Sequence, residues 1–154
     1  MKKYKLIALY FIVLMPLLTN GQDWLRYTKK EVMRGLSKNL KSNDFSATIQ
    51  HTDSTITFLV RDSNFVDLDV IYYLDNQGRV EKETHKSICD SCYKKYTNAL
   101  LQNKKYGWKM LSKSFYISKF SKRIIMQISS LDFEYSLIYM PWNRNQYEEL
   151  LGTE

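Results

Sequence analysis

Apolar residues recur with two different periods along this chain, and the first is the period of a helix. Between residues 29 and 41 they return every three or four positions, which places them on one face of a helix. Directly before this stretch, Thr28 and Glu31 form a T-x-x-E capping box, in which each side chain can accept a hydrogen bond from a backbone N–H of the first turn. The pattern predicts a helix over residues 29–41. Its buried face is formed by Val32, Met33, Leu36 and Leu40.

Beyond this helix, apolar and polar residues alternate one by one, which is typical of strands with one buried and one solvated face. The loop Asp75-Asn76-Gln77-Gly78 predicts a hairpin turn, because glycine accepts the positive φ that such turns need. The strand that returns from it, residues 79–85, is strongly charged, so we expect it at an edge of the sheet or with one face in water. The strands expected in this half of the chain cover residues 46–50, 55–61, 66–74 and 79–85.

A second helix is expected over residues 91–105, where Tyr93, Tyr96 and Leu100 share one face. Alternation then predicts further strands, and a short helix is expected after Asn143. These further strands cover residues 115–119, 124–128 and 133–139.

The expected order of elements is helix, three or four strands, helix, two or three strands and a short helix. Nearly all of the links between strands are short. Short links allow only antiparallel hairpins, because a parallel return needs a crossover of about a dozen residues. We therefore expect a two-layer α+β domain, with one twisted antiparallel sheet of about five to seven strands and two main helices packed on one face.

This order resembles the α-β-β-β-α-β-β-α arrangement of the secretion-chaperone-like fold, with the helices at 29–41 and 91–105 in its two principal helical positions. The resemblance is one of element order and carries no functional residues. The composition rich in Lys, Asn and Tyr, the Asn-Gly-Gln stretch at residues 20–22 and the Asp-Asn-Gln-Gly hairpin are similar to small exported proteins of the Bacteroidota. That similarity implies export and no particular activity.

The first 22 residues have the layout of a signal peptide, with three lysines, an apolar run over residues 6–15 and a small polar end. A membrane anchor is the alternative, but the apolar run is shorter than the roughly 20 residues that span a bilayer. We expect cleavage near Gly21 or Gln22, which leaves residues 23–154 as a single α+β domain exported to the periplasm or the extracellular medium. The chain would then meet a membrane only through its signal peptide, before cleavage.

The charge of the chain argues against a nucleic-acid partner. The formal net charge is +7, and three of these charges belong to lysines of the signal peptide. The remaining excess is small and spread along the sequence, so it does not form the basic patch that nucleic-acid binding requires.

Cys89 and Cys92 form a C-x-x-C motif at the expected start of the second helix. In an oxidising compartment we expect a disulfide that fixes the corner between strand and helix. Two alternatives stay open. A helix N-terminus favours thiolates, so the pair can support disulfide exchange. His85 also adds a third possible zinc ligand, and a fourth would have to come from His51 or a carboxylate.

Aromatic residues are the remaining clue, with 12 Tyr, 7 Phe and 3 Trp. Tyr73, Tyr106 and Tyr116 alternate away from the apolar faces of their segments, so we expect them on an exposed binding surface of the kind found at protein interfaces and sugar sites. The common nucleotide, metalloprotease, calcium and hydrolase motifs do not occur, so no cofactor and no catalytic set are expected. The sequence favours a non-catalytic binding module of the cell envelope with a protein or carbohydrate ligand. The alternative is a thiol-active or metal-binding protein centred on Cys89 and Cys92.

Overall fold

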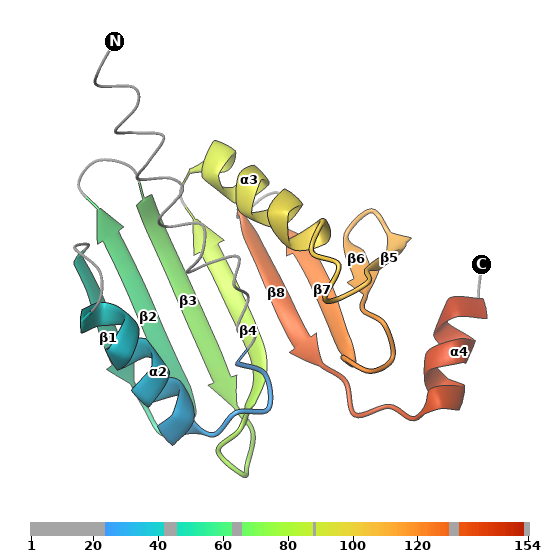
Figure 1. Ribbon diagram of the computed structural model, residues 1–154, viewed down its shortest axis with the longest axis horizontal. Coiled ribbons are helices and arrows are strands. Elements are labelled where there is room, and N and C mark those ends of the chain that lie inside the picture. Colours follow the sequence, from blue (N-terminus) through green and yellow to red (C-terminus); the bar gives the residue numbers. More distant parts are fainter. Residues whose placement is uncertain (1–23, 42–45, 63–65, 88, 130–132, 153–154) are drawn as a thin grey trace.

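Within the described residues, eight strands form one open antiparallel sheet and three helices accompany it in the computed structural model of this chain (Figure 1). The structure describes residues 24–41, 46–62, 66–87, 89–129 and 133–152. The expected signal peptide, residues 1–22, lies outside the described residues. In chain order the elements are α2 (Lys29–Lys41), β1 (Ser46–His51), β2 (Thr55–Asp62), β3 (Val66–Leu74), β4 (Val80–Ser87), α3 (Asp90–Leu101), β5 (Lys109–Ser112), β6 (Phe115–Ile117), β7 (Ile124–Ser129), β8 (Glu134–Tyr139) and α4 (Arg144–Gly152).

The strand order β1-β2-β3-β4-β8-β7-β6-β5 divides the sheet into two matching halves that meet at the β4–β8 pair. Each half is a helix followed by four strands, since α2 leads into β1–β4 and α3 leads into β5–β8. All neighbouring strands are antiparallel, so the predicted α+β fold with one antiparallel sheet is confirmed. The sheet has eight strands instead of five to seven. The strand missed in the sequence is β5, which has only four residues and a register irregularity against β6.

The two long helices lie on the same face of the sheet, with α2 against β1 and β2 and α3 against β4 (Figure 1). We call this side the core face, and it confirms the expected two-layer arrangement. The apolar face of the predicted helix packs there against the apolar side chains of the strands, because the burial of apolar surface away from water is favourable. The most deeply buried core residues on these elements include Val32, Leu36, Ile56, Val70, Val80 and Met126.

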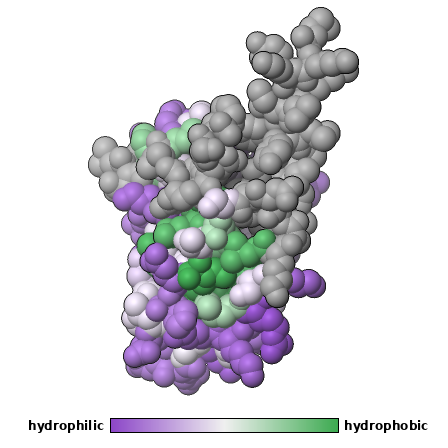
Figure 2. All heavy atoms as spheres, turned by 90° about the vertical axis from the view of Figure 1, so that its left-hand side faces the viewer, coloured by the Kyte–Doolittle hydropathy of each residue, from purple (hydrophilic) through white to green (hydrophobic). Residues whose placement is uncertain are grey.

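At the β1 edge of the sheet, beside α2, apolar residues of the core lie at the molecular surface. Figure 2 looks at this side and shows a hydrophobic patch with hydrophilic residues around it. Half-buried apolar residues at this end that pack against the core are Met33 of α2, Ala47 and Ile49 of β1, and Phe58 of β2. We call these four residues the β1-side patch.

The first helix begins where its capping box predicts. The Thr28 backbone N–H donates to Glu31 Oε2 at 2.8 Å, and the Glu31 N–H donates to Thr28 Oγ1 at 3.4 Å. The prediction of a helix over residues 29–41 is thereby confirmed.

The second helix, α3, ends at Leu101, four residues before the predicted end. Local side-chain bonds explain this, because Asn103 Oδ1 accepts from the Lys105 N–H at 3.0 Å and turns the chain instead of extending the helix. The Tyr106 N–H then donates to the Asn103 carbonyl at 3.1 Å. This turn carries Tyr106 into the core.

The strongly charged strand β4 lies in the middle of the sheet, between β3 and β8, so it does not form an edge. The other expected placement, with one face in water, describes the strand better, because Lys86 is exposed on the open side of the sheet. Its charges divide between the two faces. Glu83 is 2% exposed and points to the core face, whereas Lys82 and Lys86 point away from it. The buried Glu83 has a partner on the core face, the backbone N–H of Trp24.

Candidate binding face

The side of the sheet opposite α2 and α3 is called the open face here. Successive residues of a strand point to opposite faces, so residues adjacent to buried core positions belong to the open face. Ile71, for example, lies between Val70 and Tyr72, which are both buried in the core. Over β1, β2 and β3 none of the described helices covers this face (Figure 1).

One row of side chains crosses the open face without a single charge. Strands lie ~4.8 Å apart, so a row over seven strands extends roughly 30 Å. At its centre Thr84 and Ser136 are buried, and their hydroxyls are hydrogen-bonded at 2.9 Å. Gln127 and Phe115 towards one end of the row are exposed. In sheet order this uncharged row consists of Gln50, Thr57, Ile71, Thr84, Ser136, Gln127 and Phe115.

The two rows beside the uncharged row differ in charge. On one side the strand register places Asp69 opposite Lys86 and Lys86 opposite Glu134, so the sign of the charge alternates across the sheet. The row on the other side has one charged residue, Lys82, whose Nζ lies over the ring of Tyr73, 5.2 Å from its centroid. This row then continues across β8, β7 and β6 with Ile138, Ile125 and Ile117. The open face therefore carries both signs and no block of like charge.

The third helix, α4, closes the far end of the open face over β6 and β7. Ile117 of β6 packs against Tyr147, whose hydroxyl donates to the Ser118 carbonyl at 3.1 Å. At the start of α4, the Asn143 N–H donates to Gln146 Oε1 at 2.8 Å and the Gln146 N–H donates to Asn143 Oδ1 at 3.0 Å. These contacts fix the helix against the sheet.

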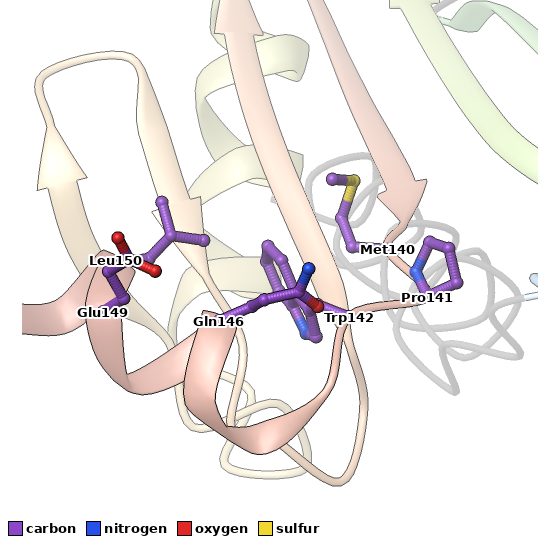
Figure 3. A pocket seen from close by; sticks show the side chains of 6 residues that line it. All are labelled: Met140, Pro141, Trp142, Gln146, Glu149 and Leu150. Carbon is purple, nitrogen blue, oxygen red and sulfur yellow. The ribbon is translucent and has the colours of Figure 1, made fainter.

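A pocket of about 480 Å³ opens between α4 and the link that connects it to β8 (Figure 3). Trp142 in its lining is 6% exposed, while Leu150 is 38% exposed. The pocket is mainly apolar, and its volume suits one or two side chains of a partner. Its lining consists of Met140, Pro141, Trp142, Gln146, Glu149 and Leu150.

The structure separates the three tyrosines that the sequence pattern groups. Tyr73 lies half-buried on the open face. Tyr116 points to the core face, because it pairs with the fully buried Met126. Tyr106 is 1% exposed, and its ring stacks on Trp108 with centroids 5.0 Å apart. The expected common surface of Tyr73, Tyr106 and Tyr116 is therefore corrected, and only Tyr73 belongs to the open face.

Cys89 and Cys92 lie at disulfide distance, with their Cα atoms 5.1 Å apart. Cys89 is the N-cap of α3, and its Sγ accepts a hydrogen bond from the Cys92 N–H at 3.2 Å. The Cys89 N–H in turn donates to Ser87 Oγ at 3.2 Å. The pair thus occupies the corner between β4 and α3, as the sequence predicts.

His85, the third candidate zinc ligand, points to the core face beside other partners. Its ring stacks on Tyr135 with centroids 4.6 Å apart and planes inclined by 10°. Its Nε2 lies 3.4 Å from Glu83 Oε2. Within the described residues no group of three His, Cys, Asp or Glu side chains could hold a metal ion. The structure therefore does not bring His85 together with the cysteine pair as a ligand set.

Glu83 is the buried charge that the sequence pattern gave no sign of. Its carboxylate lies among the aromatic residues of the core face and accepts from the Trp24 backbone N–H. Burial raises the pKa of the Tyr72 and Tyr135 hydroxyls, and the negative charge of Glu83 raises both further. Both tyrosine hydroxyls near the Glu83 carboxylate therefore stay protonated and uncharged. Since Trp24 and Glu83 are 59 positions apart, no local pattern could have identified the contact.

Neither a protein-family model, nor a curated protein, nor a solved structure matches this chain. Among the described helices, none has the length and apolar character needed to cross a membrane.

Proposed function

We propose that this protein is a non-catalytic binding module of the cell envelope that recognises a protein partner through the open face. The accessible members of the uncharged row carry this proposal, namely Gln50, Thr57, Ile71, Gln127 and Phe115. Charged residues are depleted at the centre of protein interfaces, because their desolvation is costly, and are tolerated at the solvated rim. The uncharged row is bordered on one side by the charged row of Asp69, Lys86 and Glu134, which has the position of such a rim. Export to the envelope is part of the proposal and rests on the expected signal peptide, residues 1–22.

The composition of the open face favours a protein over the other ligand classes. Nucleic acids need a basic surface, whereas Asp69 and Glu134 alternate with Lys86 here. Sugar sites usually combine several accessible aromatic rings, whereas the ring of Tyr73 has Lys82 over it and Phe115 is the exposed ring of the uncharged row. A strip of roughly 30 Å matches the extent of a protein interface, and the pocket beside α4 can receive an apolar side chain.

Gln127→Arg is expected to weaken partner binding at least tenfold. Gln127 is exposed in the uncharged row, so the variant should fold, but it adds a charge that the partner would have to desolvate. In the experiment, the purified protein serves as bait in an envelope extract, and bound proteins are cross-linked to it. The measured quantity is the amount of each captured protein.

The matched control is Gln102→Arg. Gln102 is also exposed, but it lies at the end of α3, on the other side of the sheet. The control should capture the same proteins as the wild type. Equal capture by all three proteins, or equal loss with both variants, would contradict recognition through the open face.

The second candidate is a thiol-active protein, and one observation favours it. The Cys92 N–H points at Cys89 Sγ at the start of α3, where a thiolate would be stabilised after reduction. Serine at both positions is expected to lower the free energy of unfolding by only about 2 kcal/mol, because the bridge closes a very short loop. Urea denaturation measures this loss. A double variant that is folded but no longer captures the partner would favour the thiol-active function over the binding module.

A further inference from the structure

The two edges of the sheet differ in how well they are protected against pairing with another strand. Exposed edges are usually blunted by short length, lysine, proline or irregular register. β5 has three of these devices, since it has four residues, carries Lys109 and is irregular against β6. β1 has none of them. It has six residues, no lysine or proline, and a regular register along β2.

The side chains of β1 continue the two faces of the sheet to this edge. Ser46, Thr48 and Gln50 are exposed on the open face, whereas Ala47 and Ile49 are half-buried on the core face. Ala47 and Ile49 belong to the β1-side patch, so an unprotected edge and a hydrophobic patch coincide at one end of the molecule (Figure 2).

We propose that β1 pairs antiparallel with β1 of a second copy of this chain, around a two-fold axis at Thr48. In this register Thr48 faces its own equivalent, Ala47 faces Ile49, and Ser46 faces Gln50. Opposed residues of antiparallel strands share a face, so apolar side chains meet on the core face and polar ones on the open face. A shift by one residue would oppose core-face to open-face side chains and break this match.

A second copy fits this edge better than another partner because every feature of the edge is self-complementary. β1 carries no Lys, Arg, Asp or Glu, so these strongly charged side chains do not oppose the pairing of two identical strands. The two-fold axis also brings the two β1-side patches together, which is the arrangement of an isologous dimer. The dimer joins two eight-stranded sheets into one continuous sheet with both open faces on the same side. This inference does not rest on the proposed function.

Charge reversal at the two-fold axis tests the proposal. The wild-type protein should be a dimer by light scattering at concentrations up to about 100 µM. Thr48→Lys alone and Thr48→Glu alone each oppose like charges and should weaken self-association about fivefold. An equimolar mixture of the two variants opposes unlike charges and should recover the dimer. Thr48 is exposed, so both variants should keep the far-UV circular dichroism of the wild type.

The matched control is Ser112→Lys on β5, the other edge, which should leave the dimer unchanged. A wild-type protein that stays monomeric over the whole concentration range would overturn the proposal. So would a dimer that survives Thr48→Lys and Thr48→Glu unchanged, a mixture that does not reassociate, or a dimer broken by Ser112→Lys.

Discussion

Gly35→Ala is expected to lower the free energy of unfolding by about 2–4 kcal/mol, although alanine favours helices by about 1 kcal/mol over glycine. A Cβ on Gly35 would lie 2.1 Å from Cη2 and 2.6 Å from Cζ2 of the Trp24 ring. The ring has little room to move, because the Trp24 N–H is bonded to the buried Glu83 and the ring packs edge-on against Tyr27, with centroids 5.3 Å apart. The added methyl group must therefore push the indole out of its site, and the lost burial outweighs the gain in helix propensity.

Urea denaturation measures this loss, and tryptophan fluorescence should shift to longer wavelength as the Trp24 ring becomes solvated. Gly152→Ala is the control, since Gly152 is also helical but has no atom within 4 Å of the added Cβ. It should stabilise the protein by no more than about 1 kcal/mol, because only the helix propensity changes there. If Gly35→Ala proves as stable as Gly152→Ala, the close packing of Trp24 on α2 is wrong.

The features that could be predicted from the sequence are those decided by neighbouring residues. The capping box of Thr28 and Glu31 sets the start of α2 because both partners lie within one turn. Gly78 marks the hairpin and has a φ of 69°, as its turn requires. Alternation likewise predicts most strands, because it reports which side of each strand leaves water.

The features that could not be predicted depend on which distant segments meet. The charges of β4 predict an edge or a face in water, and only the pairing with β8, where Thr84 bonds Ser136 across 52 positions, makes the strand central. The residues next to Tyr106 in the sequence are polar and do not indicate burial. Tyr106 is buried in the core because α3 ends early, at Leu101, and the chain turns there. The uncharged row could not be predicted from the sequence either. Each strand contributes one residue to it, and only the order and register of the strands align these residues.

The segment that precedes α2 shows how such distant contacts can hold a chain in place. The Arg26 N–H donates to the Val80 carbonyl at 2.7 Å, and the Val80 N–H donates to the Tyr27 carbonyl at 2.9 Å. This segment therefore runs beside the first residue of β4. Trp24, at its beginning, is 9% exposed and lies against α2.

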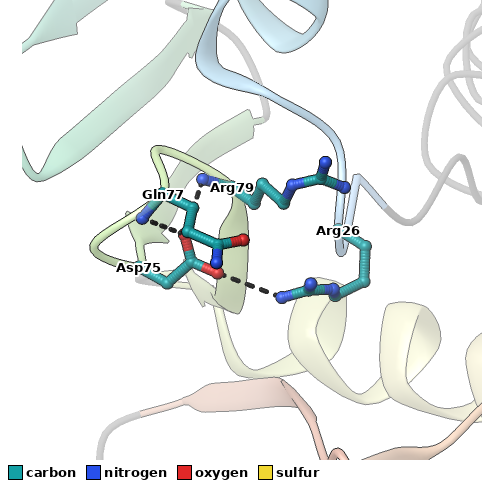
Figure 4. A network of polar contacts seen from close by, with 4 residues as sticks. All are labelled: Arg26, Asp75, Gln77 and Arg79. Carbon is teal, nitrogen blue, oxygen red and sulfur yellow. Dashed lines mark hydrogen bonds and ion pairs between the residues drawn. The ribbon is translucent and has the colours of Figure 1, made fainter.

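Two carboxylates anchor this segment, and they differ in exposure. Asp75 lies at the hairpin, where Arg26 Nη1 donates to its Oδ2 at 3.0 Å and the backbone N–H groups of Arg79 and Gln77 each donate to its Oδ1 at 2.9 Å (Figure 4). These bonds, that of Arg79 foremost, hold the pKa of Asp75 below its usual range. Glu83 is the second anchor and is buried. Because water cannot replace a lost partner in the core, Glu83 should matter more for stability than Asp75.

Glu83→Ala is accordingly expected to lower the free energy of unfolding by about 3 kcal/mol, since it leaves the Trp24 N–H without its acceptor and opens a cavity beside Tyr72 and Tyr135. Glu83→Gln should cost only about 1 kcal/mol, because the amide oxygen fills the same space and still accepts from Trp24. Glu81→Ala is the control on the same strand, exposed and expected within about 0.5 kcal/mol of the wild type. Urea denaturation of the three variants separates the possible causes. If glutamine proves as harmful as alanine, the negative charge and not the accepted hydrogen bond holds the segment, and if alanine proves as harmless as Glu81→Ala, Glu83 is no anchor at all.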